Sequence, residues 1–206
     1  MQIRVNPTRM AMLRQRRRLA VAKRGHKLLK DKLEGLVRVF MDLVSEYAAL
    51  RDQADRDLPA TLQLFRLASG ASGQEQVATA LEECEVSAHI AVSGRRVMSV
   101  PFPTLALDGF SFQAAYSALA TTTDFDMACQ RFRELFPRLL ELASKEEALV
   151  RLADEIEKTR RRVNALEYVL IPGLKALIRS IASKLEEADR STRARLMKVK
   201  AMLTAQ

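Results

Sequence analysis

Clustered arginine and lysine side chains are the residues of this sequence whose types and spacing could do chemistry. One cluster comprises Arg14, Arg16, Arg17, Arg18, Lys23 and Arg24, a second comprises Arg160, Arg161 and Arg162, and a third comprises Arg190, Arg193, Arg195, Lys198 and Lys200. Guanidinium and ammonium groups bind carboxylates and phosphates. The simplest interpretation is a solvated helix face with internal pairs such as Glu157–Arg161, four residues apart. The alternative is electrostatic contact with a partner.

No combination of residues predicts catalysis. The sequence has no GxxxxGK phosphate loop, no GxGxxG, no HExxH and no GxSxG. Glu82, Glu83 and Glu85 are adjacent acids and do not form a spaced acid/base pair. Cys84 and Cys129 have no metal-ligand spacing, and we interpret them as reduced structural thiols of a cytosolic protein. We therefore expect no catalytic residue, no cofactor and no metal in this chain.

The composition favours long helices and an acidic partner. The 206 residues are 48% hydrophobic but only 5% aromatic, with seven Gly and six Pro. Such a chain is typical of helical rods and atypical of sandwiches or barrels. The formal charge of +9 indicates an acidic partner, such as nucleic acid, an anionic membrane or an acidic protein surface. No run of eighteen apolar residues occurs, so we expect no membrane span.

The N-terminal segment carries a coiled-coil pattern. Pro7 and Thr8 can open a helix. Mostly apolar side chains then recur at alternating steps of three and four residues. We predict a helix over residues 7–66, and its seam includes Leu19, His26, Leu29, Leu33, Leu36, Phe40 and Leu43. Gly25, inside this helix, is interpreted as a point of close helix approach or slight bending.

The C-terminal segment carries the matching pattern. We predict a helix over residues 124–203 with a seam at Ile156, Val163, Leu170, Leu177 and Ile181, continuing past Leu185 to Leu196 and Val199. Pro137 and Pro172 should bend this helix without ending it. Tyr168 is expected in the core.

The middle of the chain, residues 67–123, differs from both ends. Gly70 to Gly73 should break the first helix, and a short helix should follow from Gln74 to Glu85. We predict a β-hairpin over residues 86–100, with strands at 86–92 and 97–100 joined by a turn at 93–96. Pro101 and Pro103 should end it, and residues 105–123 should form a loop.

Together these elements predict a mainly α fold. Two long helices joined by a compact insertion should form an antiparallel two-helix coiled coil with a small central head that combines a helix and a β-hairpin. Both chain ends should lie side by side, which places Leu19 near Val199. Charge is uneven along this arrangement: residues 1–38 carry twelve Lys/Arg and two acids, whereas residues 67–130 carry two Lys/Arg and seven acids.

Several segments resemble the D subunit of the V-type and archaeal-type rotary ATPases. The resemblance rests on Asn6-Pro7-Thr8-Arg9-Met10, on residues 22–32, on residues 158–172 and on residues 195–200. It covers roughly residues 5–45 and 150–200, and the middle matches only in outline. It implies a non-catalytic rotor shaft on the cytoplasmic side, peripheral to the membrane. The implied partners are the catalytic A and non-catalytic B subunits, the small F subunit, and a socket subunit that links the shaft to the membrane rotor ring.

Given this resemblance, we favour contact with the A/B ring for the first and second basic clusters and leave the third open. The rival hypothesis is a basic helical hairpin that binds nucleic acid. It rests on charge alone, because the clusters have little aromatic interleaving and no recognised binding motif. Attachment to a membrane through an amphipathic helix is weaker still, because the apolar stripe is needed inside the hairpin.

Overall fold

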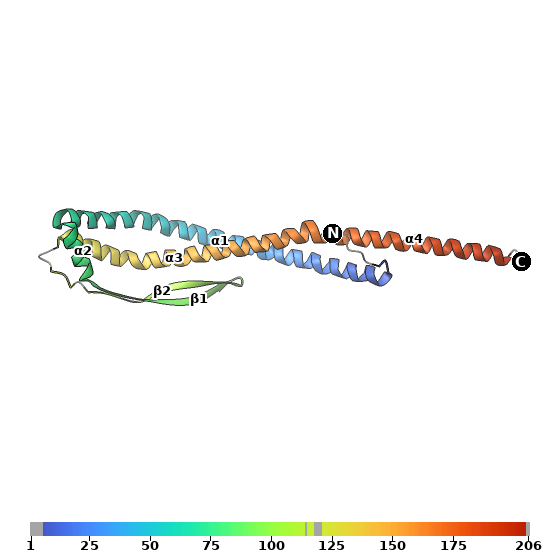
Figure 1. The fold of residues 1–206 in the computed structure, drawn as a ribbon, viewed down its shortest axis with the longest axis horizontal. Coiled ribbons are helices and arrows are strands. Elements are labelled where there is room, and N and C mark those ends of the chain that lie inside the picture. The colour runs from blue at the N-terminus through green and yellow to red at the C-terminus, as the bar shows by residue number, and fades with distance from the viewer. Residues whose placement is uncertain (1–5, 114, 118–120, 205–206) are drawn as a thin grey trace. The chain divides into compact units, whose positions relative to one another are not determined.

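The structure, a computed structural model, describes residues 6–113, 115–117 and 121–204. In chain order its elements are α1 (Arg9–Ser72), α2 (Gln74–Glu82), β1 (Glu85–Val97), β2 (Val100–Gln113), α3 (Thr123–Asn164), the π-helix η1 (Ala165–Leu170) and α4 (Ile171–Thr204) (Figure 1). The mainly α fold class, with two long helical segments and a small antiparallel hairpin, is confirmed.

The chain separates into two compact units. The terminal unit combines the residues up to Glu34 with those from Glu157 onward, and the central unit is Gly35–Ile156. Helices α1 and α3 each contribute to both units. The predicted division into residues 7–66, 67–123 and 124–203 stays a prediction.

Capping explains where α1 begins and ends. The hydroxyl oxygen of Thr8 accepts a hydrogen bond from the Ala11 backbone N–H at 3.1 Å, as an N-cap residue does. The helix continues through Pro59 and Gly70 and ends at Ser72, so the predicted end near residue 66 was wrong. Gly73 follows with a φ of 94°, a conformation that favours glycine, and this residue separates α1 from α2.

In the central unit, α1 and α3 run antiparallel and the hairpin lies against them (Figure 1). Ion pairs join Lys145 to Glu46 and Arg138 to Asp57, each at 3.1 Å. Two apolar clusters form its core. One contains Leu36, Val100 and Leu152, and the other contains Ala68, Val77, Ala80, Phe125 and Cys129.

The hairpin is longer than the predicted one at residues 86–100. Its turn is Met98–Ser99, whereas Ser93 to Arg96 are part of β1. A two-residue turn makes Val97 and Val100 the first hydrogen-bonded pair, so Pro101 and Pro103 occupy positions whose N–H would point away from β1. Proline is tolerated there because no ladder bond is lost. Residues 105–113, predicted as loop, therefore belong to β2.

The hairpin tip docks on a notch in α1. Met98 and Ser99 both have positive φ, 47° and 78°, which side-chain-bearing residues adopt rarely. A Cβ added at Gly35 would lie 2.5 Å from the Met98 Cε, so the missing side chain makes room for methionine. Val100, directly after the turn, is buried against Leu36 and Leu152.

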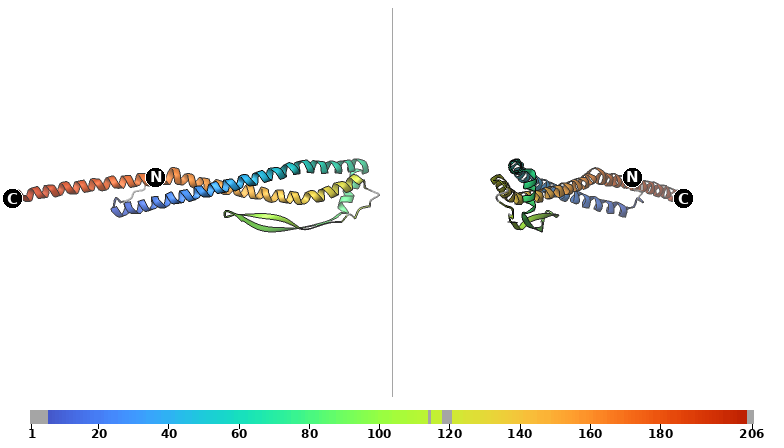
Figure 2. Two further views of the ribbon diagram at one scale, coloured as in Figure 1. Left: turned by 180° about the vertical axis from the view of Figure 1, so that it is seen from behind. Right: turned by 60° about the vertical axis from the view of Figure 1, so that its left-hand side comes forward.

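In the terminal unit, the beginning of α1 lies antiparallel to η1 and α4 (Figure 2). His26 Nε2 lies 3.3 Å from a Glu167 carboxylate oxygen, and Arg9 lies 3.4 Å from Asp189. This register places Leu19 between the levels of Glu167 and Asp189, and Val199 beyond them. The expected proximity of Leu19 and Val199 was therefore wrong.

Two glycines of α1 provide a matched test of the notch. The Gly25→Ala variant should gain about 1 kcal/mol of unfolding free energy, because alanine is the better helix former and its Cβ would meet no atom within 4 Å. This open space also removes the need for Gly25 in close helix approach. Gly35→Ala should gain less, because Met98 must move. Urea unfolding followed by circular dichroism measures both, and equal gains would contradict the docked tip.

The buried thiol provides a test of the central core. Burial raises the pKa of Cys129 to about 11, with smaller contributions from the neighbouring Cys84 and Asp126. In a Cys84→Ala background, iodoacetamide at pH 8 should label Cys129 roughly a hundredfold more slowly in the folded than in the urea-unfolded chain, because less thiolate is present. The folded-state rate should rise with pH up to about 11. Equal rates at pH 8 would mean that Cys129 is not in this core.

Candidate functional site

The terminal unit concentrates the positive charge of the chain. Its segments, residues 1–34 and 157–206, carry 23 Lys/Arg and 7 Asp/Glu, a net charge of +16. Residues 35–156 carry 11 Lys/Arg and 18 Asp/Glu, a net charge of −7, and the two values sum to the +9 of the whole chain. The basic clusters therefore belong to a strongly cationic unit.

All nine residues of the first two basic clusters are exposed. Arg161 forms an ion pair with Glu157, as its spacing predicts. Among the residues that the structure describes, the other eight form no ion pair: Arg14, Arg16, Arg17, Arg18, Lys23, Arg24, Arg160 and Arg162. These side chains present guanidinium and ammonium groups to solvent, where they can bind carboxylates or phosphates.

Some cations of the central unit form ion pairs. Arg51 pairs with Asp55 within α1, and Arg151 pairs with Glu147 within α3. Lys145 lies between Glu46 and Glu141, and these carboxylates raise the pKa of its ammonium group against the opposing effect of burial. Exposed arginines without a described ion pair also occur in the central unit, for example Arg56, Arg66 and Arg131. The terminal unit differs in its net charge of +16, which makes its surface the candidate binding site.

A buried polar side chain accompanies each of the two clusters. Gln15, among the arginines at 14 and 16–18, is 6% exposed, and Thr159, directly before Arg160, is 1% exposed. Neither Gln15 Oε1 nor Thr159 Oγ1 has a hydrogen-bond partner within the described part of the chain. The sequence interpretation missed Thr159. Its position, seven residues after Leu152 and four before Val163, could have identified it.

The structure places the predicted seam residues at different depths. Leu36, Val163 and Ile181 are buried. Eight others are partly buried: Leu19, His26, Leu29, Leu33, Phe40, Leu43, Ile156 and Leu177. Leu170 is the exception, because 46% of it is exposed.

The π-helix explains why Leu170 is exposed. Pro172 has no N–H to donate to the carbonyl of Tyr168, and the segment directly before it, Ala165–Leu170, winds as a π-helix. A π-turn contains one residue more than an α-helical turn. The buried positions after it therefore lie one residue later in the sequence than in an uninterrupted α-helix. Leu166 is accordingly followed by partly buried Ile171 and buried Leu174. The expectation that Tyr168 is in the core was also wrong, since it is 71% exposed.

The third basic cluster lies on the part of α4 that follows Asp189. Arg190 approaches Glu187 at 3.9 Å, and Arg193, Arg195, Lys198 and Lys200 are exposed. Leu196 and Val199, predicted to continue the seam, are 64% and 52% exposed. This stretch extends beyond Arg9, the level at which α1 begins, so α1 offers it no apolar face.

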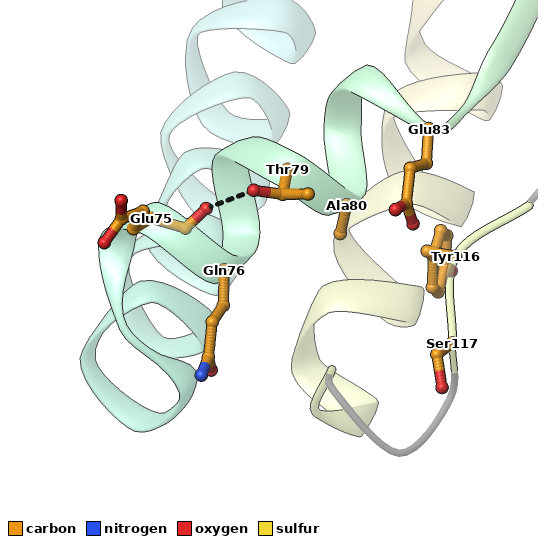
Figure 3. Close-up of a pocket in the computed structure, with 7 residues that line it drawn as sticks. All are labelled: Glu75, Gln76, Thr79, Ala80, Glu83, Tyr116 and Ser117. Atoms are coloured by element: carbon orange, nitrogen blue, oxygen red, sulfur yellow. Dashed lines mark hydrogen bonds between the residues drawn. The ribbon is translucent and has the colours of Figure 1, made fainter.

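A cavity of about 380 Å³ lies beside α2 in the central unit (Figure 3). Glu75, Gln76, Thr79, Ala80, Glu83, Tyr116 and Ser117 line it. The Tyr116 hydroxyl donates to Asp126, and burial together with this carboxylate raises its pKa, which keeps the phenol protonated. The cavity contains none of the predicted site residues.

The described residues contain no group of three His, Cys, Asp or Glu side chains arranged to hold a metal ion. Across the same part of the chain, no helix combines the length and the apolar character that crossing a bilayer requires.

Comparison with known proteins gives one consistent family. The family model described as the ATP synthase D subunit matches residues 11–201. A V-type ATP synthase D subunit from Thermoanaerobacter sp. is 42% identical over 203 residues, covering 98% of this chain and 97% of the relative. The corresponding protein from Acetivibrio thermocellus is 43% identical over 208 residues, covering 99% and 94%. That from Clostridioides difficile is 42% identical over 202 residues, covering 97% and 91%.

Two leucines test the shifted stripe. Leu174→Ala should lower the unfolding free energy by about 2–5 kcal/mol, because it opens a cavity in the helix pair. Leu170→Ala, on a side chain that is 46% exposed, should cost less than about 1 kcal/mol. Urea unfolding measures both variants. The reverse order would mean that the stripe continues through Leu170 without the extra residue.

Proposed function

The chain belongs to the family of ATP synthase D subunits, and from this premise we propose that it is the central-stalk subunit of a V-type ATPase. In this role it couples ATP hydrolysis or synthesis in a ring of A and B subunits to ion translocation through the membrane ring. It is a non-catalytic subunit, and the nucleotide sites belong to its partners. Its further partners are the F subunit and a socket subunit above the membrane ring.

One observation supports this role above the others: the eight exposed cations without an acidic partner among the described residues belong to a unit that is strongly cationic as a whole. A net charge of +16 on that unit steers it toward an acidic surface. Exposed ion pairs contribute only about 0–1 kcal/mol each. Many weak contacts suit a surface that must move past its partner without locking, and we assign the first and second basic clusters to the A/B ring on this ground.

The helix pair supports the mechanical part of the proposal. Two helices that bury their stripes against each other resist bending and separation, because either motion exposes apolar surface. Their surfaces differ from place to place, with exposed arginines at Arg160 to Arg162 and exposed apolar or aromatic side chains at Tyr168, Val169 and Leu170. Rotation then changes which face each catalytic site meets, and a different contact can shift the nucleotide affinity of that site.

A charge-neutralised variant tests the assignment. Arg16→Gln, Arg17→Gln and Arg18→Gln together should slow association with the purified A/B ring about tenfold at low salt, and the deficit should shrink as ionic strength rises. The matched control carries Arg56→Gln, Arg66→Gln and Arg131→Gln, three exposed arginines of the central unit, and should associate at the wild-type rate.

Coupling is measured in the assembled complex as ATP-driven ion uptake into vesicles. Uptake in a complex that lacks this chain would contradict the central-stalk role. Equal association rates for the triple variant, its control and the wild type would contradict the arginine assignment alone. Tight binding of the purified chain to duplex DNA at physiological salt would instead favour the nucleic-acid hypothesis.

A further inference from the structure

Both long helices of the central unit contain an exposed proline at nearly the same level. Pro59 lies inside α1 and Pro137 lies inside α3. The ion pair between Asp57 and Arg138 fixes how the two antiparallel helices are aligned. Pro59 lies two residues after Asp57, and Pro137 one residue before its partner, which is the same direction along the pair. At about 1.5 Å per residue, the two prolines therefore lie within about one helical turn of each other.

The backbone of both helices is weakened at this level. Pro59 has no N–H to donate to the carbonyl of Asp55, and Pro137 likewise leaves the carbonyl four residues before it without its helical donor. Thr61 adds a second perturbation, because its hydroxyl donates to the carbonyl oxygen of Asp57 at 2.9 Å. Such bonds from a threonine to the preceding turn often bend helices. The helix pair is therefore easier to bend here than a pair of regular helices would be.

The apolar seam between the helices is thin at the same level. Between the two apolar clusters of the central unit, the buried residues of α1 are Ala54 and Thr61. The alignment of the helices places them near the levels of Leu142 and Leu135 of α3. Each of these contacts buries less apolar surface than two leucines would. Bending the pair at this level therefore exposes little apolar surface to water.

The β-hairpin is irregular at this level too. Its register shifts directly after His89, which leaves Asp108 of β2 without a partner in β1. Such a bulge bends the strand that contains it. The ring of Phe110, two residues after the bulge, lies 5.6 Å from the ring of Phe136, the residue directly before the proline of α3. The bulge is therefore located beside the two prolines.

The hairpin is attached to the rest of the unit on both sides of its bulge. On one side, Phe112 packs against the apolar cluster at α2. On the other side, the Leu105 N–H donates to the Ser144 hydroxyl oxygen at 2.9 Å, and Arg151 donates to the carbonyl oxygen of Pro101 at 3.2 Å. Both helical residues belong to α3, along which the hairpin lies (Figure 1). A straight, regular hairpin attached in this way would brace the helices against bending, whereas a bulged hairpin can bend with them.

We propose that the central unit has a hinge at the level of Pro59, Pro137 and Asp108, which lets the end that carries α2 tilt relative to the other end. Each of the three elements that cross this level has a point of bending there, and the three points coincide. Helices kinked at proline bend by angles on the order of 20°. Two body segments, each with its own apolar cluster, lie on either side of the hinge.

The use of this hinge rests on the proposed function. A central stalk is held by different partners at its two ends. A stiff shaft must strain or release one of these contacts whenever the partners are out of line. Tilting at the hinge lets the α2 end remain bound while the rest of the shaft moves, because little apolar surface is exposed by the tilt.

Residual dipolar couplings of the full-length chain, alone in a dilute alignment medium, test the hinge directly. Backbone N–H couplings from residues 40–55 and 140–154 report the orientation of one side, and those from residues 62–72 and 123–134 report the other. A rigid unit is fitted by a single alignment tensor. We expect the two sides of the wild type to need different tensors. The Pro59→Ala, Pro137→Ala double variant should need only one, because its added N–H groups complete both helices.

The matched control is Pro172→Ala, which replaces a proline of α4 in the terminal unit. Its central unit should need two tensors, as the wild type does. Pro59 and Pro137 are exposed, so alanine fits at both positions, and circular dichroism checks that the helical fold is kept. A single tensor for the wild type would overturn the hinge. Two tensors that persist in the double variant would overturn its assignment to the prolines.

The use of the hinge is tested separately in the assembled complex. Ion uptake per ATP hydrolysed should fall several-fold when the complex contains the double variant. Unchanged uptake with a variant that is rigid in solution would overturn the use assigned to the hinge. Failure of the central-stalk role itself gives a different result, namely uptake by a complex that lacks this chain.

Discussion

Neither long helical segment of this chain can bury its apolar stripe without the other, and this mutual burial is the constraint on which the structure depends. In the central unit Leu36 and Leu152 are fully buried. In the terminal unit Val163, Leu174 and Ile181 are 2–7% exposed. The ion pairs between helices lie at the surface and contribute little energy. They mark the antiparallel register, whereas the apolar contacts stabilise it.

Because the stripe is used internally, the opposite faces of the helices are available for partners. The eight cations without an acidic neighbour lie on such faces in the terminal unit. An arginine that is already paired must give up that pair before it can bind elsewhere, whereas a free arginine exchanges only water. Unpaired arginines occur in the central unit as well, so it is the net charge of +16 on the terminal unit, against −7 on the central unit, that favours the terminal unit as the one that meets an acidic surface.

Much of the fold follows from periodicity. An apolar stripe with alternating steps of three and four residues is buried most completely against a second helix with the same kind of stripe. The cap at Thr8 and the Glu157–Arg161 pair are equally local, and both were predictable. The extent of the hairpin could not be predicted from the sequence, because Ser93-Gly94 has the composition of a turn. The true turn is evident only from the docking of Met98 at Gly35 and the burial of Val100 and Phe102. The basic clusters of the candidate site could be identified from the sequence. Their lack of acidic neighbours could not, because it depends on which carboxylates the fold brings within reach.

The π-helix at Ala165–Leu170 has a consequence for how such sequences are compared. Its extra residue shifts every later position of α4 by about 100° around the helix axis relative to an uninterrupted α-helix. Consider a protein of the same fold that lacks the extra residue. Its sequence aligns correctly with this chain both before and after the π-helix only if a one-residue gap is placed inside a continuous helix, where alignments seldom place one. Without that gap, residues aligned with each other after Ile171 would lie on different sides of the helix in the two proteins. A buried residue of one protein would then be aligned with a solvent-exposed residue of the other.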